Sequence, residues 1–85
     1  AQYGEDHIAT AVAAFFLGDS HLALRNFSEA LPFLERAADT FERVAETDLA
    51  TLTVLKKLAA VFKEQGNYDK AVSVLQRSLL ITVFS

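Results

Sequence analysis

The chain lacks cysteine, methionine and tryptophan, and it has only one proline and three glycines among its 85 residues. Without cysteine it can form neither a disulfide bond nor a zinc–thiolate site. With so few helix-breaking residues and 52% apolar residues, the composition favours a well-buried helical chain over a disordered one. The absence of cysteine is compatible with the reducing cytosol, and we expect a cytoplasmic protein with one small domain.

Long apolar runs and concentrated positive charge are also missing. The longest apolar stretches, residues 8–18 and 79–84, are shorter than the roughly 18 residues that a membrane span requires. The net charge is −3 with acidic and basic residues interspersed, whereas binding to nucleic acid needs a concentrated basic surface. We therefore expect neither a membrane nor a nucleic acid as partner. The one local basic cluster, Lys56, Lys57 and Lys63, is of a kind that more often forms a solvated helix face.

What the sequence does contain is an internal repeat. When the chain is aligned with itself at a shift of about 41 residues, identical residues coincide at helical spacing and around the same turn. Chance does not arrange identities in this way, so we infer a duplicated helical unit. The identical pairs are Glu5 and Glu46, Ala9 and Ala50, Thr10 and Thr51, Leu17 and Leu58, Asn26 and Asn67, Ala30 and Ala71, Leu34 and Leu75, and Arg36 and Arg77.

Apolar residues within each unit follow the i, i+3, i+4, i+7 spacing of a helix with one buried stripe. The pattern predicts four helices, at residues 7–24, 27–45, 48–65 and 68–83, and turns this short make consecutive helices antiparallel. On the second helix we expect an exposed ion pair between Asp39 and Arg43. The expected buried stripes are Phe27, Ala30, Leu31, Leu34, Ala37, Phe41 and Val44 in the second helix, and Tyr68, Ala71, Val72, Leu75, Ser78 and Leu79 in the fourth.

The expected helix ends coincide with residues that favour caps. Asn26 and Asn67 are preferred N-cap residues, and Gly66 suits the left-handed conformation that often follows a helix. Asp6 and Thr47 are the N-cap candidates for the other two helices. Pro32 leaves two alternatives open: the second helix begins no later than Phe27 and contains the proline, or it begins near Leu31 after a looser turn.

The segment 66–71, Gly-Asn-Tyr-Asp-Lys-Ala, resembles the central turn of a tetratricopeptide repeat, and the chain is identified as a member of that family. The resemblance implies an all-α fold of two antiparallel helical hairpins, four helices in all, stacked as a short α-solenoid. Small residues let the helices of each hairpin approach closely. They are Gly18, Ala30 and Ala37 in the first hairpin, and Ala59, Ala71 and Ser78 in the second; Leu58, Phe62 and Leu75 complete the resemblance.

The repeat length of about 41 residues exceeds the ordinary length of about 34 and is similar to the kinesin light chain group. Segments 4–7, 9–11 and 29–37 resemble the sequence pattern of that group, including its proline. The resemblance implies one domain over residues 1–85, with repeats at about 4–44 and 45–85, and we expect it to be part of a longer array. The resemblance does not imply the cargo specificity of that group. At the positions where the group has asparagines that line its groove, this chain has Phe15-Phe16 and Lys56-Lys57.

The sequence offers no convincing catalytic or metal-binding constellation. Asp19, Ser20 and His21 are adjacent, but neighbouring residues on a helix point about 100° apart and cannot line up as a catalytic triad. His7 and His21 lack the spacing of paired metal ligands, and glycine-rich phosphate loops are absent. We therefore expect a protein that is not an enzyme and needs no cofactor.

The remaining candidate site is the concave surface, which the first helix of each hairpin lines in stacked repeats. Its apolar part would bind an aromatic or leucine anchor of a partner peptide, and its basic part would bind acidic residues. Alternatively, the Phe15-Phe16 pair is buried by neighbouring helices. The expected lining is Val12, Phe15, Phe16, Asp19 and Leu22 from the first repeat, and Thr53, Lys56, Lys57, Ala60 and Lys63 from the second.

Two apolar segments predict further burial. Residues 8–17 show no polar face, which indicates cover on every side, and residues 79–84 are apolar on more than one side. We expect the latter to pack against another repeat, another chain or a folded-back tail. Two functions follow: a protein-binding module with a peptide or helix in its groove or, alternatively, an architectural component that self-associates and leaves the groove unused.

Overall fold

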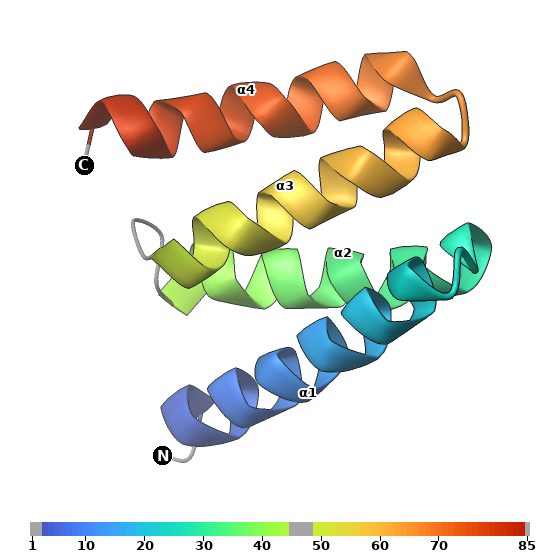
Figure 1. Ribbon diagram of the computed structural model, residues 1–85. Coiled ribbons are helices and arrows are strands. Elements are labelled where there is room, and N and C mark those ends of the chain that lie inside the picture. The colour runs from blue at the N-terminus through green and yellow to red at the C-terminus, as the bar shows by residue number, and fades with distance from the viewer. Residues whose placement is uncertain (1–2, 45–48, 85) are drawn as a thin grey trace.

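The computed structural model describes residues 3–44 and 49–84, and the side chains within residues 8–44 and 49–80. Its helices are α1 (Tyr3–Ala23), α2 (Phe27–Val44), α3 (Leu49–Glu64) and α4 (Tyr68–Phe84). They lie side by side in chain order, each antiparallel to its predecessor (Figure 1). The predicted all-α fold of two helical hairpins is confirmed. None of the helices in the described ranges is long and apolar enough to cross a membrane.

The first helix begins earlier than predicted. α1 starts at Tyr3, so Asp6 lies within its first turns and the prediction that Asp6 is an N-cap is wrong. No proline interrupts the segment, so its backbone can continue the helix towards the N-terminus. The N-cap candidate Thr47 lies outside the described residues.

The two hairpin turns have the same hydrogen-bond pattern. In the first, the amides of Arg25 and Asn26 donate to the carbonyls of Leu22 and His21, at 2.9 and 2.8 Å. The second turn has this pattern at the equivalent positions of the second repeat, with donors Gly66 and Asn67 and acceptors Lys63 and Phe62, at 3.0 and 2.8 Å. This pairing of 5→2 and 6→1 bonds is the Schellman motif, and Gly66 has the left-handed φ of 77° that it requires. The predicted left-handed conformation of Gly66 is therefore confirmed.

Within the first hairpin the helices approach closely at Gly18. A Cβ atom placed there would lie 2.7 Å from Cγ of Leu34 and 3.2 Å from the backbone nitrogen of the same residue. Leu34 is fully buried. The predicted small residues of both hairpins are also buried, so the side chains at the crossing are small because the backbones leave no room for larger ones.

Pro32 lies inside α2, which begins at Phe27. The longer of the two predicted helices is therefore correct, and the alternative start near Leu31 is wrong. The Pro32 side chain is exposed, and its missing amide proton removes only one helical hydrogen bond near the start of the helix. The predicted pair of Asp39 and Arg43 is also present, at 3.5 Å.

The core lies between α1, α2 and α3 and extends along the inner side of α4. For α4 most of the predicted stripe is wrong: Ala71 and Ser78 are buried, but the other four residues, Tyr68, Val72, Leu75 and Leu79, are about half exposed or more. The reason is position, because α2 packs against a helix on each side whereas α4 packs mainly against α3 (Figure 1).

The prediction that α1 is covered on every side is also wrong within this chain. Ala11 and Ala14 are buried, whereas Leu17 is 48% and Phe16 61% exposed. α1 packs mainly against α2, so only one face of α1 is enclosed.

Candidate functional site

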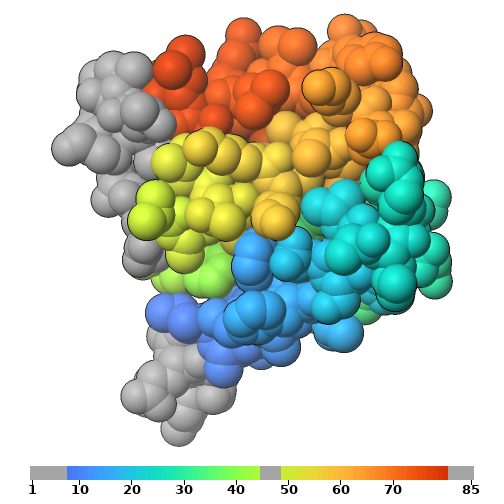
Figure 2. Space-filling view, viewed as in Figure 1, coloured from blue at the N-terminus to red at the C-terminus, as the bar shows by residue number. Residues whose placement is uncertain are grey.

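The α1 and α3 helices form one face of the molecule, and they run in the same direction along it. Figure 2 shows this face, with α2 largely hidden behind the two helices. Because the first helices of successive hairpins are parallel, equivalent residues of the two repeats line the face in register. Every predicted groove residue lies on one of these two helices: Val12, Phe15, Phe16, Asp19 and Leu22 on α1, and Thr53, Lys56, Lys57, Ala60 and Lys63 on α3.

An apolar pocket lies between the middle of α1 and the N-terminal half of α3. Its volume is about 230 Å³. Cavities of about 150 Å³ already admit a benzene ring, so this pocket has room for one aromatic or leucine side chain. We call it the groove pocket; it is lined by Val12, Phe15 and Phe16 of α1, Phe41 of α2, and Ala50, Thr53 and Val54 of α3.

The two phenylalanines of the groove pocket have different surroundings. Phe15 is half-buried and packs against the core, whereas Phe16 is 61% exposed. Their rings lie 5.7 Å apart at 57° to one another. The alternative that neighbouring helices bury the pair therefore holds for Phe15 only, because Phe16 presents its ring to solvent at the rim of the pocket.

Sequence reasoning missed three residues of this pocket. Phe41 was assigned to the buried stripe of α2, and it is buried, yet it also lines the pocket. Ala50 and Val54 share a helix face with Thr53 by their i, i+3, i+4 spacing, and that spacing was a usable signal. No sequence signal of this kind indicated that Phe41 of α2 lines the pocket, because that position depends on how the two hairpins stack.

Ion pairs occupy the other end of the groove. Lys57 Nζ lies 2.8 Å from Asp19 Oδ1, and Arg25 Nη2 lies 3.3 Å from Glu64 Oε1. Both pairs are well exposed, so each contributes at most about 1 kcal/mol to stability. Their main consequence is for charge, because Lys57 and Asp19 neutralise each other and the predicted basic part of the groove is reduced to Lys56 and Lys63.

Lys56 and Lys63 are both exposed on α3, two helical turns apart, and neither forms an ion pair with a described residue. Leu22 differs from the other predicted groove residues, since it is half-buried and packs against the core away from the groove pocket. The groove thus combines an apolar pocket at one end, ion pairs at the other, and two lysines that pair with no described residue.

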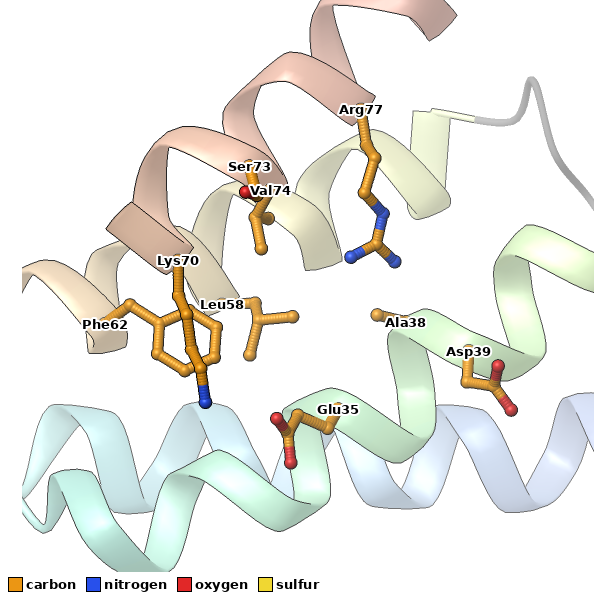
Figure 3. A pocket seen from close by; sticks show the side chains of 9 residues that line it. All are labelled: Glu35, Ala38, Asp39, Leu58, Phe62, Lys70, Ser73, Val74 and Arg77. Atoms are coloured by element: carbon orange, nitrogen blue, oxygen red, sulfur yellow. The ribbon is translucent and has the colours of Figure 1, made fainter. Parts of the chain in front are cut away.

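A second hollow, of about 280 Å³, lies on the opposite face between α2 and α4 (Figure 3). Its floor is formed by Leu58 and Phe62 of α3. The Nζ atom of Lys70 lies 5.6 Å from the centre of the Phe62 ring, and its side chain extends over the ring towards α2. Arg77 donates to Glu42 with 3.0 Å between Nε and Oε2. These contacts of Lys70 with α3 and of Arg77 with α2 hold α4 against the rest of the protein. We therefore assign the residues around this hollow a structural role.

The candidate catalytic residues diverge in the structure. Asp19 pairs with Lys57 on α3, whereas the His21 ring stacks on Phe33 of α2 with centroids 5.7 Å apart and planes at 9°. His21 Nδ1 is buried and makes no hydrogen bond within the described part of the chain. Among the same residues no group of three or more histidine, aspartate and glutamate side chains could hold a metal ion.

Comparison with known proteins identifies the family. A sequence model described as tetratricopeptide repeat matches residues 21–81, which is well over half of the chain. No curated protein and no solved structure matches the chain. Tetratricopeptide repeats generally act as scaffolds for interactions between proteins and are typically not enzymes. The paired Schellman turns, the small residues at the helix crossings and this match agree, and the chain belongs to the tetratricopeptide repeat family.

Proposed function

We propose that this protein is a non-enzymatic module that binds an acidic peptide or helix of a partner protein in the groove between α1 and α3. The observation that carries the proposal is the groove pocket, an apolar hollow of about 230 Å³ on the same face as Lys56 and Lys63, which form no ion pair within the described part of the chain. An enclosed enzyme site would need convergent titratable groups, and the described lining residues of this pocket contain none.

The pocket favours an aromatic or leucine anchor. Its lining consists of apolar side chains and Thr53, so an inserted side chain gains apolar burial and needs few hydrogen bonds. Binding would also cover the exposed ring of Phe16. Anchors of this kind commonly contribute most of the affinity at protein interfaces.

The lysines favour acidic residues in the same ligand. Lys56 follows the pocket residue Thr53 by about one helical turn, and Lys63 follows Lys56 by two turns, so all three lie along one side of α3. A ligand that runs along α3 from the pocket therefore meets positive charge beyond its anchor. Such charges mainly raise the association rate and the specificity.

We also propose that the repeats are of the long type found in the kinesin light chain group. The two Schellman turns occupy equivalent positions about 41 residues apart, which supports a unit longer than the ordinary repeat of about 34 residues. The ligand would nevertheless differ from those of that group, because Phe15-Phe16 and Lys56-Lys57 replace its groove asparagines. We place the protein in the cytoplasm, as its composition suggests.

The test is a selection from a displayed peptide library, followed by affinity measurements with the enriched peptides. We expect acidic peptides with an aromatic residue or leucine to be enriched. Phe16→Ala should weaken binding about tenfold or more by removing the rim of the pocket. Lys56→Glu should weaken it several-fold through charge repulsion.

Arg36→Glu is the matched control, because it makes the same charge change at an exposed position of α2, outside the groove. It should bind like the parent protein. The proposal fails if no peptide is enriched, or if Phe16→Ala and Arg36→Glu bind the enriched peptides equally well.

A second candidate function is an architectural role in which the chain associates with other chains and the groove stays unused. The exposed apolar residues of α4 favour it. The peptide selection separates the two functions, because a purely architectural protein would enrich no groove ligand.

A further inference from the structure

The outer side of α4 carries a continuous row of exposed apolar side chains, which we call the α4 stripe. It consists of Tyr68, Val72, Leu75 and Leu79, which are 62%, 53%, 48% and 60% exposed. Their spacing of four, three and four positions places them along one face of the helix. A row of this length is unusual on a surface that stays in contact with water.

The internal repeat shows what such a stripe contacts. Leu34 and Ala38 of α2 are the equivalents of Leu75 and Leu79 in the first repeat, and they are only 0% and 1% exposed. Positions that face the helix of the same hairpin are buried in both repeats, as Ala30 and Ala71 are. The difference therefore lies in the helix of the following hairpin. In the first repeat that helix is α3, which covers α2, whereas no described helix covers α4 in the equivalent way.

The first helix carries the complementary face. In α3, which packs on α2, Thr51, Val54, Leu58 and Val61 are buried, at 3% exposed or less. Their equivalents in α1 are all exposed. We call these four residues the α1 open face: Thr10, Ala13, Leu17 and Ser20. The molecule thus exposes, at its two ends, the two sides of a contact that it already makes internally.

We propose that a second copy of this chain stacks head to tail on the first, with its α1 open face on the α4 stripe in the way that α3 lies on α2. A hydrogen bond supports the register. Thr51 Oγ1 donates to the carbonyl of Phe41 on α2, at 3.3 Å. The equivalent donor is Thr10 of the second copy, and the equivalent acceptor is the carbonyl of Thr82 of the first.

Charge at the junction between copies differs from charge inside the chain. The internal junction carries the Asp19–Lys57 ion pair. The equivalent positions are Ala60 of the first copy and Phe16 of the second, and neither carries a charge. Association between copies therefore rests on apolar burial, and high salt should not weaken it.

The contact joins two different surfaces, so it leaves one α1 open face and one α4 stripe free after each addition. Such a heterologous contact extends into longer chains of molecules unless a ring closes. The average mass should therefore increase with protein concentration beyond that of a dimer. A symmetric contact between two α4 stripes would stop at the dimer.

Sedimentation of the whole chain over a wide concentration range tests the proposal. Leu17→Asp and Leu75→Asp each place a charge on one of the two surfaces, and each variant should remain monomeric at concentrations where the parent associates. Mixing the two variants should restore association as a dimer only, because each still has one intact surface. Circular dichroism of each variant checks that its helices are retained.

The matched control is Leu24→Asp, since Leu24 is 70% exposed and its equivalent, Gln65, is exposed too. It should associate like the parent. A parent that is monomeric throughout would overturn the proposal. So would association of Leu17→Asp at the parent's concentrations, which indicates a symmetric α4 contact, or a mixture of the two variants that stays monomeric.

Discussion

Arg25 and Gly66 occupy the same position in two equivalent helix-ending turns, and both have a left-handed backbone, with φ of 63° and 77°. Glycine takes this conformation at no steric cost, whereas a residue with a Cβ atom is strained in it. Arg25 has compensating contacts, because its guanidinium pairs with Glu64 and lies 5.0 Å from the centre of the Phe27 ring.

Gly66→Ala should lower the free energy of unfolding by about 1 to 2 kcal/mol. A Cβ atom at this position would meet no atom within 4 Å, so the loss would come from backbone strain alone. Chemical denaturation measures it. At Arg25 the glycine variant should be about 1 kcal/mol more stable than the alanine variant, since both lose the side-chain contacts and only one keeps the strain. If Gly66→Ala is as stable as the parent and Arg25→Gly is as stable as Arg25→Ala, the left-handed backbone conformation does not limit which residues fit these turns.

Gly18→Ala should destabilise the first hairpin by roughly 1 to 2 kcal/mol, as overpacking against the buried Leu34 outweighs the higher helix propensity of alanine. Leu34→Ala would remove the side-chain atoms that the new methyl group meets. In the Leu34→Ala background, Gly18→Ala should therefore be neutral or stabilising. A double-mutant cycle that gives no coupling between the two positions would show that the helices are further apart than described.

His21→Phe should raise the free energy of unfolding by about 1 kcal/mol, because it removes a buried Nδ1 atom that has no hydrogen-bond partner in the described residues. The substitution keeps an aromatic ring on Phe33. The second repeat already has phenylalanine at this position, Phe62. Thermal unfolding measures the change, with His21→Ala as the control that loses the stacking and should unfold at lower temperature. A less stable phenylalanine variant would mean that the histidine nitrogen is satisfied in solution.

The adjacent residues Ala71 and Val72 should respond in opposite ways. Ala71 is 6% exposed and faces α3, so Ala71→Leu should overpack the hairpin and cost about 1 to 3 kcal/mol. Val72 is 53% exposed, and Val72→Leu should change stability by no more than about 0.5 kcal/mol. If denaturation ranks the two variants the other way round, α4 is rotated from the orientation described.

Binding of an acidic peptide in the groove should weaken as salt increases, because Lys56 and Lys63 are exposed and screened. A double variant with glutamine at both positions should lose most of this dependence and retain the contribution of the apolar anchor. Isothermal titration at several salt concentrations measures the salt dependence of the affinity and the affinity that remains at high salt. Parent affinity that is independent of salt would remove the lysines from the site.

Local chemistry made much of the fold predictable. Helical periodicity located the helices to within a few residues, and Asn26, Asn67 and Gly66 marked the turns because their preferences act over neighbouring residues. The start of α1 was missed because helix ends without a strong breaker are set by weak and distributed terms.

The sequence by itself determined the helices, their turns, the internal repeat and the helices that form the candidate groove. Only the tertiary structure decided that Lys57 pairs with Asp19, that Phe41 lines the groove pocket, and that Leu75 is exposed while its equivalent Leu34 is buried. The physical reason is that each of these outcomes depends on which helix packs against which. Two identical leucines in equivalent positions of the repeat differ in burial because only one of them has a helix on both sides.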